Sequence, residues 1–448
     1  MSKALSYKKT NLNEGDERQA VRGFCAEYID FLNSCKTERK CTSFFENAAK
    51  AAGFKELDFA APLKEGDKFY IVNRGKSIFL GVMGSRPVSE GVHIVTAHID
   101  SPRLDLKPCP VCEMDGLGFL KTHYYGGIKK YQWTALPLAM YGVAVLKDGS
   151  VVEIEDDSLT FCITDLLPHL STEQSEKKVS KAIEGEDLKI LAASKPYAEG
   201  ENENKVKETI LNTLYERFKI TERELVSAEI SFVPKVEAAS VGFDNSMVGA
   251  YGQDDRVCAY TAFKAIMDAK NPQYTALVCL VDKEEIGSDG VTGMQSTFFD
   301  MVMDKISGEH NPYLVNYNSR CLSADVNAAF DPIYPSVLDK QNACWLGCGP
   351  SVTKYTGSRG KAGTSDACAE TVGYFINLFD DHQIVWQTGQ LGKVDMGGGG
   401  TVAKYTANRN IATVDIGVGL LSMHSPYEIA AKADVYETYR AFKTFLEN

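Results

Sequence analysis

Two adjacent glutamates follow a long apolar segment in the middle of the chain. Residues 274–281 (Tyr-Thr-Ala-Leu-Val-Cys-Leu-Val) are almost all apolar, and an acidic cluster with Glu284 and Glu285 comes directly after them, before Gly287. This pattern is typical of a buried strand whose end opens into a site. Adjacent side chains on an extended backbone point to opposite sides, so Glu284 and Glu285 are predicted to differ in role. One could bind a cation while the other takes a proton from water, which is the chemistry of metal-assisted hydrolysis. The alternative is a solvated acidic loop.

A histidine and an aspartate end a second apolar segment, residues 92–100. Because side chains alternate along a strand, His98 and Asp100 are expected on the same face. His98 could coordinate a metal while Asp100 accepts its other ring proton, an arrangement that fixes the tautomer of a ligand histidine. The alternative is a histidine buried in the core.

Two further segments carry carboxylates beside predicted elements. Residues 253–255 (Gln-Asp-Asp) precede a predicted helix over 257–269, and Asp325 ends a third short apolar segment. Each alone could be an ordinary acidic turn.

The fifth segment contains His424, which is predicted to lie on a loop just before a helix over 425–446. Ser425 as N-cap, Pro426 at the first helical position and Glu428 three residues after the cap together form a capping box. Five such segments at the ends of predicted elements favour a single site over five coincidences.

The five motifs, in this order, resemble the M18 family of metallo-aminopeptidases, the aspartyl aminopeptidase-like enzymes. The motifs are residues 96–102, 253–255, 282–288, 323–325 and 421–425, and the likeness runs from about residue 20 to the C-terminus. It implies an α/β fold, in which a mixed-sheet zinc-peptidase catalytic domain is interrupted by a β-rich dimerisation or oligomerisation domain. It also implies a peptide substrate and two Zn²⁺ ions per subunit. Co²⁺ or Mn²⁺ could also occupy a site with such nitrogen and oxygen ligands.

The resemblance gives each motif residue a role. The implied metal ligands are His98, Asp254, Glu285, Asp325 and His424. Asp254 would bridge the two ions, with His98 and Asp325 on one ion and Glu285 and His424 on the other. The general base would be Glu284, and Asp100, as the partner of the other ring proton of His98, is also counted among the catalytic residues. Where many members have Leu-Asp-Asn, this chain has Gln253-Asp254-Asp255, which leaves Asp255 as the alternative bridge.

Residues outside the metal motifs are implicated in substrate binding. Lys354 and Arg359 lie in a segment that resembles the family's substrate pocket, where a lysine would pair with an acidic side chain; the alternative is a surface lysine. Gly398 and Gly399 belong to a run of four glycines at 397–400, which permits close backbone approach and could line the substrate or form a flexible hairpin. In the family, a histidine of the inserted domain reaches a neighbouring subunit's active site, and His169 is the candidate here.

Regular elements are predicted on both sides of the motifs. The predicted helices are 16–36, 42–52 and 363–378, and the predicted strands are 68–73, 77–82, 383–386 and 411–418. Helices before consecutive strands, and strands separated by helices downstream, favour an α/β sheet with an antiparallel portion. Active sites in such sheets lie outside strand ends, where all five motifs fall.

Between about residues 107 and 236 the pattern changes to short apolar segments between glycine and acidic turns. The segments are 117–120, 137–145, 151–154 and 159–163, followed by a polar helical stretch over 175–218. A β-rich domain, 107–236, is therefore predicted to split a catalytic domain made of 1–106 and 237–448. The resemblance implies that this insert builds the interfaces of a homododecamer that is itself built from dimers.

Composition excludes several other classes. A chain of 448 residues with 44% hydrophobic content can form two cores, and a net charge of −12 with scattered basic residues argues against nucleic-acid or anionic-membrane surfaces. The N-terminal residues lack a signal-peptide core and no run of about 18 apolar residues follows, so a cytoplasmic protein is expected. The twelve cysteines are scattered, and buried free thiols are expected.

Two alternative functions stay open. Dinuclear zinc sites of this kind also serve carboxypeptidases and amide deacylases, and only the pocket and access route separate these activities. The chain could also be a binding or scaffold protein that keeps the fold without turnover, although five ligand positions and a base argue against that.

Overall fold

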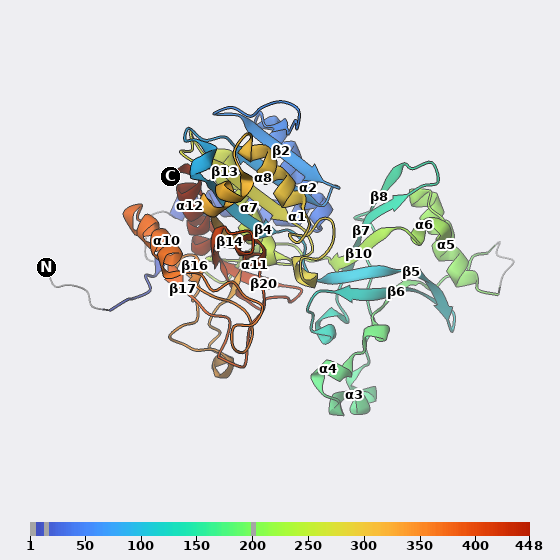
Figure 1. The fold of residues 1–448 in the computed structure, drawn as a ribbon. Coiled ribbons are helices and arrows are strands. Elements are labelled where there is room, and N and C mark those ends of the chain that lie inside the picture. The colour runs from blue at the N-terminus through green and yellow to red at the C-terminus, as the bar shows by residue number, and fades with distance from the viewer. Residues whose placement is uncertain (1–5, 13–17, 199–202) are drawn as a thin grey trace. The chain divides into compact units, whose positions relative to one another are not determined.

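The computed structural model describes residues 6–12, 18–198 and 203–448, and the chain divides into two compact units (Figure 1). The first unit contains Met1–Ser101, Ala238–Met423 and Tyr427–Asn448, and the second contains Pro102–Glu237 and His424–Pro426. In the described residues, the first unit contains two β-sheets and the second unit contains one.

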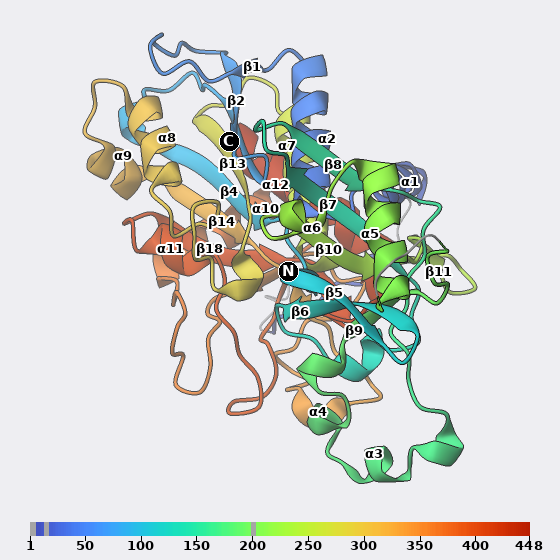
Figure 2. The same ribbon diagram turned by 90° about the vertical axis from the view of Figure 1, so that its right-hand side faces the viewer.

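The main sheet of the first unit is mixed and has nine strands (Figures 1 and 2). In spatial order they are β1 (Lys55–Glu56), β2 (Lys68–Asn73), β3 (Ser77–Val82), β13 (Thr275–Val281), β4 (Val92–His98), β14 (Arg320–Ala324), β18 (Ala412–Gly417), β16 (Ser351–Thr353) and β17 (Gln387–Thr388). The four central strands β13, β4, β14 and β18 are parallel to one another, whereas β3 and β16 pair antiparallel on either side of them. The predicted α/β sheet with an antiparallel portion is confirmed.

The central strands are apolar because both faces of the sheet are covered. Every residue of β4 and β13 is buried. Alternate residues of β13 enter different clusters: Val278 and Leu280 join one, and Leu277 and Cys279 join the other. Continuous apolar runs of this kind are typical of parallel strands between two layers of helices.

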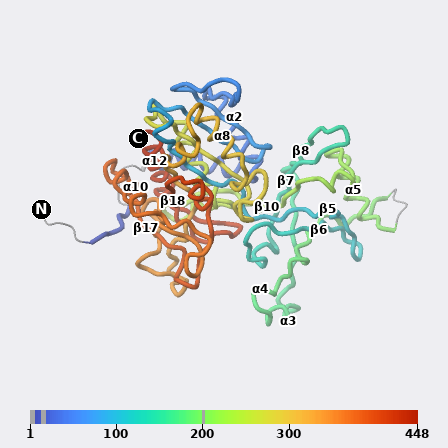
Figure 3. The backbone as a smooth tube through the Cα atoms, viewed as in Figure 1, coloured from blue at the N-terminus to red at the C-terminus, as the bar shows by residue number. Residues whose placement is uncertain are grey.

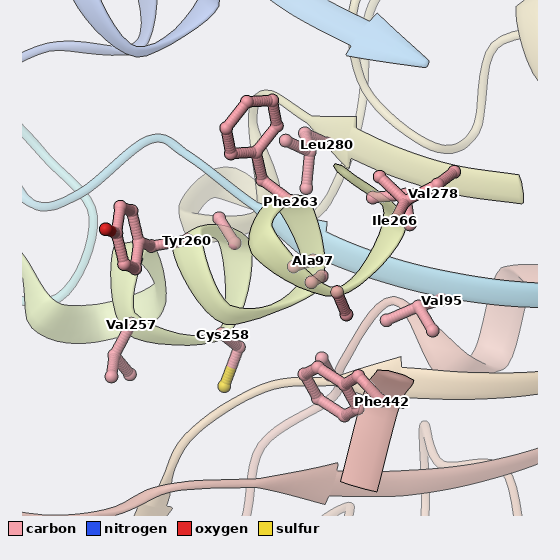
Figure 4. Close-up of a cluster of buried hydrophobic side chains, with 14 of the residues drawn as sticks. Val95, Ala97, Val257, Cys258, Tyr260, Phe263, Ile266, Val278, Leu280 and Phe442 are labelled. Carbon is pink, nitrogen blue, oxygen red and sulfur yellow. The ribbon is translucent and has the colours of Figure 1, made fainter. Parts of the chain in front are cut away.

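The helices of the first unit supply those layers. They are α1 (Arg18–Ser34), α2 (Glu38–Ala51), α7 (Gln253–Asp268), α8 (Phe298–Ser307), α9 (Pro312–Asn318), α10 (Ala369–Asp381), α11 (Ala403–Ala407) and α12 (Lys432–Glu447). Figure 4 shows Tyr260 and Phe263 of α7 on the same cluster as Val278 and Leu280 of β13. The first helix begins within the predicted 16–36, of which residues 16 and 17 lie outside the described ranges.

A second, five-stranded sheet completes the first unit. Its order is β11 (Ala239–Val241), β12 (Met247–Ala250), β20 (Glu428–Ala431), β19 (Gly419–Leu421) and β15 (Asn327–Ala328). The predicted capping box at Ser425 is therefore wrong. Glu428 begins strand β20, and α12 begins at Lys432 with Ala431 as its N-cap.

Other boundaries also differ from expectation. The helix predicted over 363–378 begins only at Ala369, and the strand predicted over 383–386 is instead β17 at Gln387–Thr388. Four cysteines, Cys109, Cys112, Cys162 and Cys368, are not buried. In the described ranges, no helix is long and apolar enough to cross a membrane.

The second unit is built on a six-stranded antiparallel sheet, visible as the blue-green part of the tube in Figure 3. Its order is β8 (Val151–Glu155), β7 (Leu138–Val145), β10 (Glu229–Pro234), β5 (Arg103–Met114), β6 (Leu117–Tyr125) and β9 (Lys189–Ala193). The helices are α3 (Thr172–Glu176), α4 (Val179–Ala182), α5 (Lys205–Phe218) and α6 (Glu222–Leu225).

Helix α5 packs on this sheet through an apolar stripe. Its buried residues, Val206, Ile210, Leu214 and Phe218, recur at a helical interval of four. The prediction of a helical stretch over 175–218 is wrong in part, because β9 interrupts it and pairs with β6. Segment 159–163 makes only isolated bridges, from Phe161 and Cys162.

Candidate metal centre

The first unit places one histidine and two aspartates within ligand distance of one another. His98 Nε2 lies 3.2 Å from Asp254 Oδ1 and 3.9 Å from Asp325 Oδ1. One ligand atom from each residue can be chosen so that all three lie within 4.8 Å of one another. His98 and Asp254 are buried, and the side chain of Asp325 is 12% exposed.

Parallel pairing brings His98 and Asp325 together. Strand β4 ends at His98, and its neighbour β14 pairs with it in parallel, with Ser323 opposite Thr96. Continued for two residues, this register sets Asp325 opposite His98. The carboxyl ends of adjacent parallel strands meet at one edge of the sheet, so residues far apart in sequence converge there.

Asp254 reaches the same edge from the start of α7. The preceding Gly252 has φ 73°, and a Cβ there would lie 2.1 Å from Arg256 Nη1. Glycine is therefore required for the turn that delivers Asp254. Ser101 Oγ donates a 2.6 Å hydrogen bond to the backbone carbonyl of Asp254.

The two aspartates of this turn have different surroundings. Asp254 faces the imidazole of His98, whereas Asp255 Oδ2 accepts the backbone N–H of His98 at 3.3 Å. Asp254 also offers an oxygen within 4.8 Å of a carboxylate oxygen of Glu285. Asp254 therefore lies within the carboxylate cluster, whereas the carboxylate of Asp255 is hydrogen-bonded to the last residue of β4.

Asp100 connects the histidine to both glutamates. His98 Nδ1 is 3.0 Å from the Asp100 carbonyl oxygen and 3.3 Å from its Oδ1. The same carboxylate accepts the backbone N–H of Glu284 on Oδ1 and that of Glu285 on Oδ2, both at 3.2 Å. One side chain therefore orients the imidazole ring and the backbone that carries both glutamates.

The prediction of an extended backbone at Glu284 and Glu285 is wrong. Strand β13 ends at Val281, Lys283 has φ 71°, and Glu284–Ile286 form a 3-10 turn. The two side chains still differ in position. In the described residues, Glu285 belongs to a ligand group with Asp254, whereas Glu284 belongs to neither of the two groups.

The electrostatics of the cluster call for a cation. Burial raises the pKa of Asp325 and of Asp255 well above the ordinary value, and neighbouring carboxylates add to the rise. Burial would lower the pKa of His98, but hydrogen bonds to Asp100 and Asp254 and nearby negative charge raise it well above its usual range. The residues fit zinc, because one imidazole nitrogen and carboxylate oxygens are ligands that Zn²⁺ takes and a divalent ion offsets buried negative charge.

One family model matches nearly the whole chain. The model described as aminopeptidase I zinc metalloprotease (M18) matches residues 31–446. The chain belongs to the M18 family. It is a metallo-aminopeptidase, and the resemblance drawn from the five motifs is confirmed.

The relatives of this M18 enzyme align with it over nearly their full length. The probable M18 family aminopeptidase 1 of Clostridium acetobutylicum is 48% identical over 460 residues, 99% of each chain. The crystal structure of an M18 aminopeptidase from Thermotoga maritima has a TM-score of 0.95 at 41% identity and covers 99% of this chain and 100% of its own. The mApe1 dodecamer of S. cerevisiae, 21% identical with a TM-score of 0.77 over 96% and 97% of the two chains, shares the fold.

The predicted substrate residues of the M18 enzyme lie on two loops. Lys354 is exposed and directly follows β16. Arg359 lines an open surface pocket, together with Tyr355, Lys361 and Lys393. Three of these four side chains are cationic.

The glycine run holds the two loops together. Gly398 has φ 132°, and a Cβ there would lie 2.0 Å from the carbonyl oxygen of Gly357. The carbonyl oxygen of Gly399 accepts the N–H of Gly357 at 2.5 Å. The close backbone approach that a glycine run permits is present at this position.

Two predicted histidines belong to the second unit. His169 lies in a short 3-10 turn, Pro168–Leu170, and is exposed beside Leu167 and Leu170, which are 50% and 69% exposed. His424 packs with the same unit, with its Nδ1 2.8 Å from the carbonyl oxygen of Gly127.

Sequence reasoning missed three residues that hold the centre in place: Ser101, Gln253 and Glu428. The Glu428 carboxylate accepts the backbone N–H of Asp254 at 3.1 Å, although the sequence pattern assigned it to a helix cap. Its partner is 174 residues away in the chain, so no local pattern could reveal the contact.

Proposed function

We propose that this M18 enzyme is a dinuclear zinc aminopeptidase that removes an acidic or neutral N-terminal residue from peptides. The observation that carries the proposal is the position of Asp254, which lies close to His98 and Asp325 and also to Glu285. A carboxylate in that position can serve two ions. His98, Asp254 and Asp325 would hold one ion.

The second set of ligands in the proposal is Asp254 and Glu285, which offer oxygens within 4.8 Å of one another, together with His424, which the family resemblance implies. The connectivity of the backbone supports His424 as a ligand. Met423 and Tyr427, which flank His424–Pro426, both belong to the first unit, so His424 is joined by short stretches of backbone to that unit on both sides.

Each remaining residue has a role in peptide hydrolysis. Bound zinc supplies a nucleophile at neutral pH, by lowering the pKa of a coordinated water to about 7, and Lewis-acid polarisation of the scissile carbonyl. Glu284 takes the proton of the attacking water and returns it to the leaving amine. Its backbone N–H is held by Asp100, and its side chain lies close enough to Asp325 to raise the pKa of that carboxyl. The free α-amine of the substrate faces the carboxylates of the second set, which restricts cleavage to the N-terminus.

Initial rates on a panel of substrates test this proposal against its alternatives. The panel contains aminoacyl, N-acyl and C-terminal dipeptide substrates, each measured with and without added Zn²⁺, Co²⁺ and Mn²⁺. The proposal requires turnover of aminoacyl substrates alone. Turnover of N-acyl or C-terminal substrates would favour a deacylase or carboxypeptidase, and bound zinc with no turnover would favour a scaffold.

We expect Asp100→Asn to weaken zinc binding or activity by about 10-fold to 100-fold, the usual cost of changing the partner of a ligand histidine. An asparagine amide can present an N–H to His98 Nδ1, and its one oxygen can replace only one of the two carboxylate oxygens that accept the backbone N–H groups of Glu284 and Glu285. Zinc affinity and kcat on an aminoacyl substrate check this. Wild-type values in both would remove Asp100 from the proposal.

Lys354 is proposed to read an acidic side chain of the substrate. Loss of a charge-assisted hydrogen bond should lower the ratio of kcat/KM for glutamyl over leucyl substrates about 10-fold in Lys354→Ala. Lys55→Ala is a matched control, because Lys55 is an exposed lysine on β1, at the opposite edge of the nine-stranded sheet. An unchanged ratio in Lys354→Ala would leave Lys354 a surface lysine.

The second unit is proposed to mediate self-association into a dodecamer built from dimers. Support comes from the family resemblance, from a yeast protein of this fold that is a dodecamer, and from the exposed apolar side chains around His169. In such an assembly, His169 would reach a neighbouring subunit's site and stabilise the oxyanion.

Removing one oxyanion donor should lower kcat by about 10²-fold to 10³-fold in His169→Ala. Mixed oligomers of His169→Ala and Glu284→Gln should regain activity, because each subunit supplies what its neighbour lacks. His123→Ala is the control, because His123 is an exposed histidine of the same unit, on strand β6. Full kcat in His169→Ala, or no recovery on mixing, would contradict a role in trans.

A further inference from the structure

Gln253 and Glu428 hold each other across two segments of the first unit. The amide Nε2 of Gln253 donates to the backbone carbonyl of Glu428 at 2.7 Å and to that of Val248 at 3.1 Å. In return, Glu428 Oε2 accepts the backbone N–H of Asp254, the residue after Gln253, at 3.1 Å. Each side chain therefore holds the backbone of the other's segment. We call this pair of contacts the Gln253–Glu428 clasp.

Both members of the clasp are inaccessible to water. Gln253 is 0% exposed and Glu428 is 1% exposed. The amide oxygen of Gln253 accepts from the hydroxyl of buried Tyr28 at 3.3 Å, so both ends of the amide are engaged. Buried polar groups are costly unless hydrogen-bonded, and satisfied networks of this kind fix one geometry of the backbone.

The clasp lies at the junction of two ligand segments. One side is the turn that delivers Asp254, and the other is the start of β20, four residues after His424. Strand β20 is itself fixed between β12 and β19. A displacement of β20 would therefore move the Glu428 carboxylate, which accepts the backbone N–H of Asp254. It would also move the strand to which the loop with His424 is attached.

We propose that Gln253 and Glu428 are positioning residues that set the affinity of the second metal site, by fixing Asp254 relative to the segment of His424. This inference rests on the proposed dinuclear function. Removal of the clasp should loosen the ligand arrangement without removing a ligand.

The test compares two variants of the full-length enzyme, Gln253→Met and Glu428→Gln. Methionine keeps the length of the glutamine side chain without its hydrogen bonds, and glutamine keeps the shape of the glutamate without its charge. The readouts are zinc dissociation constants for each ion, the visible absorption spectrum of the Co²⁺-loaded protein, and kcat and KM at saturating metal. Thermal unfolding of the metal-free protein is measured beside them, so that a folding defect is recognised.

We expect each variant to bind the ion of the second ligand set about 10-fold less tightly, the scale on which changes to the partners of metal ligands act. The Co²⁺ spectrum should change, and excess zinc should restore most of kcat with little change in KM. Glu437→Gln is the matched control, because Glu437 is also buried and accepts the backbone N–H of Val385 at 2.6 Å, in a segment without proposed ligands. It should keep wild-type zinc affinity.

The outcomes separate this inference from the proposed function. A wild-type enzyme that binds fewer than two ions would overturn the dinuclear proposal itself. If the wild type binds two ions and Gln253→Met keeps wild-type affinity for both and an unchanged Co²⁺ spectrum, the clasp is a stabilising contact only. Should Glu428→Gln fail to fold, Gln253→Met alone decides in the same way.

Discussion

Glu284→Gln should hold as much zinc as the wild type and lose a factor of about 10² to 10⁴ in single-turnover rate, the scale of general acid–base catalysis. The reason is position. In the described residues, Glu284 belongs to neither ligand group, and its backbone is held by Asp100 in a 3-10 turn beside Asp325. A glutamine there cannot take a proton from water, but it removes no ligand. The measurement is metal analysis by mass spectrometry beside rates on one aminoacyl substrate.

The neighbouring variant, Glu285→Gln, is the control. Glu285 shares a ligand group with Asp254, so its change should lower the occupancy of one ion, and excess metal should recover part of the rate. If instead Glu284→Gln loses metal and Glu285→Gln keeps both ions, the two roles are reversed.

The second large effect is expected from Asp254→Asn. If one carboxylate serves both ions, replacing it by a neutral amide should weaken the binding of both ions. The loss of zinc affinity should exceed the roughly 100-fold that a change to the partner of a metal ligand costs. Equilibrium dialysis against buffered zinc gives both dissociation constants. Activity at ordinary zinc concentrations should fall with them.

Asp255→Asn is the matched control for Asp254→Asn. Asp255 is adjacent and buried, and its carboxylate accepts the backbone N–H of His98, which an amide oxygen can also accept. Both ions should therefore remain bound. Loss of both ions from Asp255→Asn but not from Asp254→Asn would make Asp255 the bridge, the alternative that the sequence left open.

The sequence predicted well what the parallel sheet determines. Apolar runs identified β4, β13 and β14, and the residues after each run meet at one edge because adjacent parallel strands end together. His98 and Asp325 could therefore be expected near one another before any distance was known. The pairing of His98 with Asp100 also followed from local spacing.

Long-range contacts explain what the sequence could not predict. Glu428 resembled a capping residue because serine, proline and glutamate have the right spacing. Its carboxylate instead accepts the backbone N–H of Asp254, and its backbone pairs with β12 opposite Ala250. Local propensity lost there to tertiary hydrogen bonds. The turn at Glu284 was missed for a similar reason, since Asp100, which holds it, is 184 residues away.

An anomalous difference map, collected at the zinc absorption edge from crystals of the native enzyme, decides whether Asp254 serves two zinc ions. We expect two peaks about 3.5 to 4 Å apart, with Asp254 between them, His98 and Asp325 beside one peak and Glu285 and His424 beside the other. A single peak, or a second peak without Asp254 among its ligands, would contradict this expectation.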